Sequence, residues 1–394
     1  MSENEIGYRG SKSIVLPVSY HRAIVKEQRV DGSWHRDSVF KVYSNGFREK
    51  LSNQNPFLAN IKLIGFAGYK QQLLCINRGI SNTSFKDTYN TMSAWWLTGF
   101  VDAEGCFRLS ILKNKNYKEG GKVLPFKPRL YFQIGLHRKD EVILESMKFL
   151  LGVGKISKSR PDLYELQVSS VKDISAIIKH FDKYPLITQK FSDYKLFKQA
   201  YNLIINKEHL TKEGLSKLVA IKASMNLGLS PLLKEAYPNI KPINRENVIK
   251  EIPNPDWLAG FTTGVRSGCF LVKVTKSSSH RLGWQVQLKF QITQHCRDRV
   301  LMDNIVKYLG CGYISERNDI VDFHVTKFTD IIEKIIPFFA VYPILGVKME
   351  NYNDFKLVAN LIQNNQHLTE EGLEKIKIIK SNMNSSRESN TNES

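Results

Sequence analysis

The chain has 394 residues, enough for two domains with apolar cores, and its 42% hydrophobic and 24% charged residues are typical of a soluble globular protein. Its formal net charge is +19, from 57 Lys and Arg against 38 Asp and Glu. This charge favours a polyanionic partner. We expect nucleic acid rather than a membrane, because the sequence has no long basic amphipathic helix with an aromatic face.

Three further classes are excluded by the sequence. No apolar run approaches the roughly 18 residues of a transmembrane helix. The N-terminal stretch carries acids where a secretory signal has a basic region and an apolar core, so no export is expected. The five cysteines are scattered without a CxxC pair, which disfavours a disulfide framework and a structural zinc site and is typical of a reduced compartment.

From residue 92 onward the chain repeats itself. The segment "WLTGF" returns as "WLAGF", and later "FQI", "YP", "HLT" and "MN" elements also recur. Phe132 and Phe290 are 158 residues apart, as are His209 and His367. The two histidines lack metal-ligand spacing, so we interpret them as structural residues at helix starts.

The repeat predicts the organisation of the chain. We divide it into an N-terminal extension (1–91), a first module (92–227), a proline-rich linker (228–253), a second module (254–384) and a disordered polar tail (385–394).

Each module begins with a short apolar segment, "AWWLTGFVDAEG" at 94–105 and "DWLAGFTTG" at 256–264. Both segments are predicted helices, with Gly99 and Gly260 in the middle. A glycine in a single buried helix could be incidental. Because both modules have one, we predict that the two helices pack closely along a seam.

Strands with period-two alternation follow each helix. A polar strand face is ordinarily solvated. In the second module, however, no Asp or Glu occurs from Trp257 to Arg297, which suits a surface that lies against phosphate. The amide, hydroxyl and cationic side chains on these faces can recognise base edges in a major groove. The predicted DNA-binding residues are Arg108, Ser110, Arg129, Tyr131, Lys273, Thr275, Gln285, Gln287, Lys289 and Thr293.

The string "WLTGFVDAEG" resembles the signature of LAGLIDADG homing endonucleases, and the repeated elements are similar to two-motif, single-chain members from fungal mitochondrial introns. The resemblance implies an α+β fold of two pseudo-twofold-related αββαββα modules. Their antiparallel strands would form a β saddle, with the motif helices at its centre. It also implies a mitochondrial monomer that binds about 20 base pairs of double-stranded DNA and uses Mg²⁺.

The same resemblance assigns a metal-binding role to the acid at the eighth motif position, which is Glu104 in the first module. Asp102, at the sixth position, is interpreted as a structural acid. In the second module the eighth position is Val265, and the flanking acids Asp256 and Asp298 lie before the helix and beyond the strands. The second metal-binding acid is therefore predicted to be lost.

Two symmetric pairs complete the predicted catalytic set. Lys190 and Lys348 follow the "YP" elements at equal distance, where the family has a basic residue that stabilises charge on the phosphate. Gln133 and Gln291 follow the paired phenylalanines and match positions that hold ordered water.

Three functions fit these patterns. The chain could be a homing endonuclease by descent, hydrolysing phosphodiesters with divalent metal, although double-strand cleavage is not expected with one acid. It could be a group I intron RNA maturase, which uses the same basic scaffold without acids. It could also be a nickase or a binding-only remnant.

Overall fold

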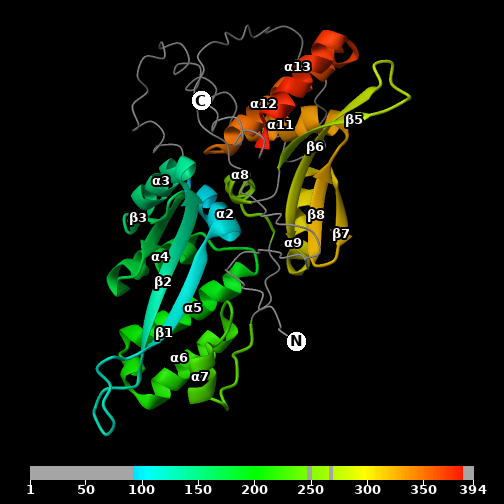
Figure 1. Cartoon of the computed structure of the whole chain (residues 1–394). Helices are drawn as coiled ribbons and strands as arrows, with labels where there is room; N and C mark the ends of the chain where they lie inside the picture. The colour runs from blue at the N-terminus through cyan, green and yellow to red at the C-terminus, as the bar shows by residue number, and fades with distance from the viewer. Residues whose placement is uncertain (1–91, 246–250, 266–268, 385–394) are drawn as a thin grey trace. The chain divides into compact units, whose positions relative to one another are not determined.

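The computed structural model describes residues 92–245, 251–265 and 269–384, so the predicted extension and tail lie outside the described residues. Two halves with the same order of helices and strands make up the described chain (Figure 1). This confirms the predicted α+β fold. None of the helices in these ranges is long and apolar enough to cross a membrane.

The first half contains one four-stranded antiparallel sheet in the order β1-β2-β4-β3. Its elements are α2 (Ala94–Glu104), β1 (Cys106–Lys113), β2 (Phe126–His137), α3 (Glu141–Leu151), β3 (Lys155–Arg160), β4 (Leu163–Val168), α4 (Val171–Lys183), α5 (Lys190–Ile205) and α6 (Lys212–Ser224).

The second half repeats this plan with the sheet order β5-β6-β8-β7. Its elements are α8 (Pro255–Gly264), β5 (Phe270–Lys276), β6 (Trp284–His295), α9 (Arg299–Leu309), β7 (Tyr313–Arg317), β8 (Ile320–Val325), a π-helical stretch (Ile331–Ile335) leading into α11 (Ile336–Val341), α12 (Lys348–Gln363) and α13 (Glu370–Ser381). Both halves therefore contain the predicted αββαββα order.

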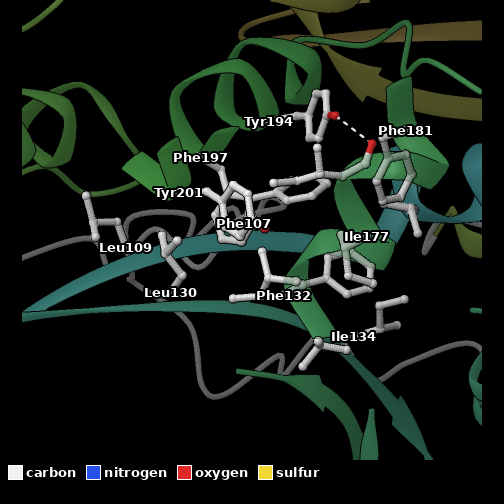
Figure 2. Close-up of a cluster of buried hydrophobic side chains, with 14 of the residues drawn as sticks. Phe107, Leu109, Leu130, Phe132, Ile134, Ile177, Phe181, Tyr194, Phe197 and Tyr201 are labelled. Atoms are coloured by element: carbon white, nitrogen blue, oxygen red, sulfur yellow. Dashed lines mark hydrogen bonds between the residues drawn. The ribbon is translucent and has the colours of Figure 1, made fainter. Parts of the chain in front are cut away.

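Each sheet buries one face against helices, as the alternation predicted. Phe107 on β1 lies at the centre of the first core, with ring centroids 5.3 to 5.5 Å from Phe132, Phe181, Tyr194 and Phe197 (Figure 2). Phe270 has the equivalent place in the second half and contacts four aromatic rings at 5.3 to 5.5 Å. Each fully buried phenylalanine contributes roughly 1.5–3 kcal/mol, so these clusters fix how the helices lie on each sheet.

The recurring "HLT" elements begin the last helix of each half. His209 and His367 lie in short 3-10 turns, and the threonine that follows each turn caps the next helix. Thr211 accepts a hydrogen bond from the backbone N–H of Gly214, and Thr369 accepts one from Gly372. The histidines therefore lie at helix starts, as expected.

The structure corrects one part of the linker prediction. Residues 231–236 form the short helix α7 (Pro231–Ala236), and its Leu233 is buried in the core of the first half. Further along, the Ile243 carbonyl accepts a hydrogen bond from Ser224. The prolines predicted a linker with little core of its own, but apolar residues between them pack on the first module. Residues 246–250 lie outside the described residues.

His180 on α4 provides a pH-dependent contribution to stability. Its Nε2 lies 3.1 Å from the hydroxyl of Thr98 on α2, and that hydroxyl donates to the carbonyl of Tyr184. Burial lowers the pKa of His180 from 6.5 to about 4. Between these values the unfolded chain binds more protons than the folded chain, so stability is full above about pH 6.5 and falls as the pH drops towards 4.

We expect this histidine to make the free energy of unfolding smaller at pH 5 than at pH 7.5, by up to about 2 kcal/mol. His180→Gln should flatten the dependence on pH. Guanidinium unfolding of both proteins at the two pH values measures the effect. If the free energy of unfolding changes by the same amount between the two pH values in wild type and variant, His180 is not the source of the pH dependence.

Candidate functional site

The helices α2 and α8 approach each other to backbone contact. A Cβ atom added to Gly99 would lie 1.9 Å from the carbonyl oxygen of Trp257, and one added to Gly260 would lie 1.9 Å from that of Trp96. A side chain at either position would overlap the backbone of the other helix. This confirms the close helix seam predicted from the two glycines.

Asp102, on α2 of the first half, holds the two seam helices together through hydrogen bonds. Its side chain is 4% exposed and accepts hydrogen bonds from Trp257 Nε1 (2.8 Å) on α8, from Ile187 N (3.0 Å), and from the backbone and hydroxyl of Thr188 (3.2 and 2.6 Å). Burial raises the pKa of Asp102, and these donors oppose the shift. They fill the roughly four acceptor positions of a carboxylate, which leaves little capacity for a metal ion.

The second half has no carboxylate at the position equivalent to Asp102. The residue equivalent to Asp102 is Thr263, whose hydroxyl donates to the carbonyl of Ala259 at 2.8 Å. The tryptophan of the first helix, Trp96, donates to the carbonyl of Pro343 at 3.3 Å instead of to an acid. The seam therefore keeps its packing on both sides, but only one side has a motif carboxylate.

Two other acids connect the halves symmetrically. Asp298, before α9, accepts from the backbone of Gln189 at 3.1 Å, and Asp140, before α3, accepts from the backbone of Val347 at 2.9 Å. Each acid therefore holds the segment of the opposite half that leads into a candidate lysine.

Glu104 is the last residue of α2 and is 8% exposed. The backbone becomes extended at Gly105 and continues into β1, where Cys106 pairs with Gln133 on β2. The end of α2 therefore places Glu104 at the start of β1, close to Gln133 on the neighbouring strand.

Lys190 lies at the start of α5 and reaches the end of α2. Its Nζ donates to the carbonyls of Val101 (3.0 Å) and Ala103 (3.1 Å) in the last turn of the helix, where carbonyls run out of helical donors. Burial lowers the pKa of the ammonium, and the charges of Glu104 and Asp102 oppose that shift. The structure therefore brings this predicted lysine and Glu104 together.

Lys348 makes similar contacts with the end of α8 in the second half. Its Nζ donates to the carbonyls of Thr262 (3.0 Å) and Val265 and lies 3.7 Å from Cys269 Sγ. Val265 is 3% exposed, and residues 266–268 lie outside the described residues. This end of α8 keeps the lysine, but an isopropyl group replaces the carboxylate.

The described residues contain no group of three or more His, Cys, Asp or Glu side chains that could enclose a metal ion. A hard cation such as Mg²⁺ is commonly held by one or two carboxylates, with water and substrate phosphate as the other ligands. Glu104 fits that pattern at the end of α2. At the end of α8, Val265 offers only a carbonyl, which already accepts from Lys348.

The predicted DNA-binding residues lie on the sheet faces opposite the cores. Cross-strand pairs join Arg108 to Tyr131, Ser110 to Arg129, Lys273 to Gln287, and Thr275 to Gln285. The guanidinium of Arg108 stacks 4.5 Å from the ring centroid of Tyr131. Lys289 is on the same face as Gln287, two residues further along β6. The alternation therefore placed these side chains on a common surface in each half.

Sequence reasoning missed an acid on the second of these faces. Asp322 on β8 accepts from Gln291 Nε2 at 2.9 Å and from the Thr293 hydroxyl. The amide nitrogen of Gln291 is therefore engaged with protein groups, the Thr293 hydroxyl and the Asp322 carboxylate. The alternation in "YISERNDIVDFHV" (313–325), with its Asn-Asp turn, predicts the β7–β8 hairpin and could have revealed Asp322.

Comparisons with known proteins agree with this architecture. The sequence model of the LAGLIDADG endonuclease family matches residues 97–201 and 258–359. Probable intron-encoded endonuclease 3 of Neurospora crassa is 37% identical over 393 residues, which cover 96% of this chain and 70% of that protein. Probable intron-encoded endonuclease 2 of the same fungus is 38% identical over 73% of this chain, which spans 64% of that protein.

Solved structures show the same similarity. The I-SmaMI LAGLIDADG homing endonuclease bound to cleaved DNA is 42% identical, with a TM-score of 0.71 over 75% of this chain and 98% of that chain. The I-CpaMI LAGLIDADG meganuclease bound to uncleaved DNA is also 42% identical, with a TM-score of 0.70 over 74% and 99% of the two chains.

Proposed function

The chain belongs to the LAGLIDADG family of intron-encoded homing endonucleases, and from this premise we propose that it binds a double-stranded DNA site of about 20 base pairs and cuts one strand. The observation that carries the proposal is the difference between the two seam helices. Glu104 ends α2, whereas Val265 follows the end of α8. One half thus has the carboxylate that phosphodiester hydrolysis needs, and the other lacks it.

In the first half, Glu104 would hold a divalent metal ion, which we propose is Mg²⁺, together with water and phosphate oxygens. When bound, such an ion activates water and stabilises the leaving 3′ oxygen. A relative, I-SmaMI, is known bound to its uncleaved DNA target in the presence of calcium ions, which supports a divalent metal.

The neighbouring residues of the first half have separate roles in this proposal. Lys190 uses two N–H groups to cap α2, and its remaining N–H can donate to a phosphate oxygen and stabilise the charge that develops there. Gln133, opposite Cys106 at the start of β1, can orient a water molecule with its amide. Asp102 positions the helix that carries Glu104 and takes no part in metal binding.

The second half keeps the surrounding groups but not the reacting centre. Lys348 contacts two carbonyls and the Cys269 thiol, and Gln291 donates to Asp322 and Thr293. We propose that these side chains preserve the local structure after loss of the acid, so that the strand facing this half is bound but not cut.

The polar sheet faces supply the binding surface. Their cationic, amide and hydroxyl groups suit phosphates and base edges, and the net charge of +19 suits a polyanion. Both halves lie on one chain, so a monomer presents both faces. Because curated relatives include a protein from an ND4 intron and others from cox1 introns of fungi, we place the protein in the mitochondrion.

The test uses the full chain and a supercoiled plasmid that carries the intronless junction DNA. With Mg²⁺ we expect nicked circles and no efficient linearisation, and with EDTA no cleavage. Linear product at low enzyme concentration would refute single-strand cleavage and mean that another residue completes the second centre. Binding without nicking in Mg²⁺ would identify a binding-only remnant. Failure to bind the junction DNA, combined with tight binding to the intron RNA, would favour the maturase function.

A further inference from the structure

Asp322 places a buried acid on the polar face of the second sheet. Its neighbours along β8, Val321 and Phe323, are in the core, so Asp322 points to the opposite face, where Lys273, Gln287 and Lys289 also lie. Its side chain is 3% exposed. A carboxylate opposes phosphate binding and is costly to bury, so its presence on this face calls for compensating partners.

Three donors from two neighbouring strands surround this carboxylate. Gln291 and Thr293 on β6 donate to Oδ1, and Arg317 Nε on β7 donates to Oδ2 at 3.1 Å. Arg317 balances the charge of the carboxylate, and all three bonds fix the orientation of their donors, because hydrogen bonds to an ionised acceptor are short and directional. Asp322 thus acts on the polar face through the groups that it holds.

Of the three donors to Asp322, Arg317 is the one whose side chain is exposed to solvent. Its side chain is 66% exposed although its Nε is bound to a buried group. Among the described residues, its two terminal nitrogens make no hydrogen bond or ion pair. The guanidinium is planar, so anchoring Nε fixes the direction of this terminal fork. A planar fork with a fixed direction matches the O6 and N7 acceptors of guanine in the major groove.

We propose that Arg317, oriented by Asp322, is a specificity-determining residue that recognises one guanine in the DNA bound by the second half. The proposal rests on the DNA-binding function proposed above. It also explains why an acid is retained on a face that binds phosphate-rich DNA. Supplying the carboxylate missing at Val265 is a poorer role for Asp322, because both of its oxygens already accept hydrogen bonds.

The first half offers a matched control. Arg160 on β3 and Glu165 on β4 are the counterparts of Arg317 and Asp322, but the register shifts between Lys158 and Arg160. In the portion of the chain that the structure describes, Arg160 and Glu165 form no ion pair. The guanidinium of Arg160 therefore has no fixed direction, and we expect it to contribute charge without base preference.

The experiment begins with the DNA site that wild-type protein selects from a randomised library. Binding in EDTA is then measured for all single-base variants of that site. Arg317→Lys keeps the charge but loses the fork, so the preference for guanine at one position should fall roughly 5- to 150-fold, with other positions unchanged. Asp322→Asn should relax the same position, whereas Arg160→Lys should relax none.

The possible outcomes separate the two proposals. If wild type selects a site and Arg317→Lys leaves every preference unchanged, or weakens all sites equally, the role of Arg317 is wrong while DNA recognition stands. If wild type selects no DNA site, the proposed function itself fails, and this proposal fails with it. Arg317 is exposed, so its lysine variant gives a result even if Asp322→Asn does not fold, which circular dichroism would show.

Discussion

Glu104→Gln should abolish strand cleavage and leave DNA binding intact. The amide has nearly the shape of the carboxylate but no charge, so it cannot hold a divalent cation beside the phosphate. We expect the nicking rate on junction DNA to fall by roughly two to three orders of magnitude, equivalent to about 3–4 kcal/mol of transition-state stabilisation. Affinity measured by anisotropy in Ca²⁺ should change little, because the sheet faces supply the binding surface.

Val265→Ala is the matched control in the other half. It changes the equivalent position without touching a carboxylate, so the nicking rate should stay close to that of wild type. Nicking that survives in Glu104→Gln would remove Glu104 from the mechanism. Loss of nicking in both variants would mean that the change acts through the seam and not through metal binding.

The fold could be predicted from sequence because its main features recur along the chain. Two apolar helices with glycines, followed by alternating strands, are local patterns, and the duplication shows each one twice. The replacement of the acid Glu104 by Val265 could also be predicted, because the repeated residues of the two motif helices align these two positions.

The parts that sequence did not predict depend on neighbours distant in the chain. Asp102 was assigned a structural role, but its acceptance of hydrogen bonds from Trp257 and Thr188 is a property of the assembled seam. The Arg317–Asp322 pair forms between two strands of a short hairpin and depends on how those strands pair. The helix in the proline-rich segment forms because Leu233 finds an apolar surface on the first half. Local propensity carries no information about such partners.

Retention of the seam and loss of the acid follow from different physical requirements. Packing at Gly99 and Gly260 is reciprocal, because each glycine accommodates the backbone of the opposite helix. A side chain at either position disturbs both halves. The acid that we propose binds metal, Glu104, would act only in its own half, and Val265 is buried without a polar side chain that needs a partner. A protein that cuts one strand, as we propose for this chain, can therefore keep both motif helices and one carboxylate.

Gly260→Ala should consequently be as damaging as Gly99→Ala, although Gly260 belongs to the half without the acid. In each variant the new methyl group would lie 1.9 Å from a backbone carbonyl oxygen, and a backbone cannot move aside as a side-chain end can. We expect a loss of at least about 3 kcal/mol in the free energy of unfolding, or failure to fold.

Gly135→Ala is the control, since its methyl group would meet only side-chain atoms at 3.5 Å or more. Urea unfolding of the three variants provides the measurement. A loss below about 1 kcal/mol in either seam variant would contradict backbone contact between α2 and α8, whereas equal large losses would show that both copies of the motif are held by packing, independently of catalysis.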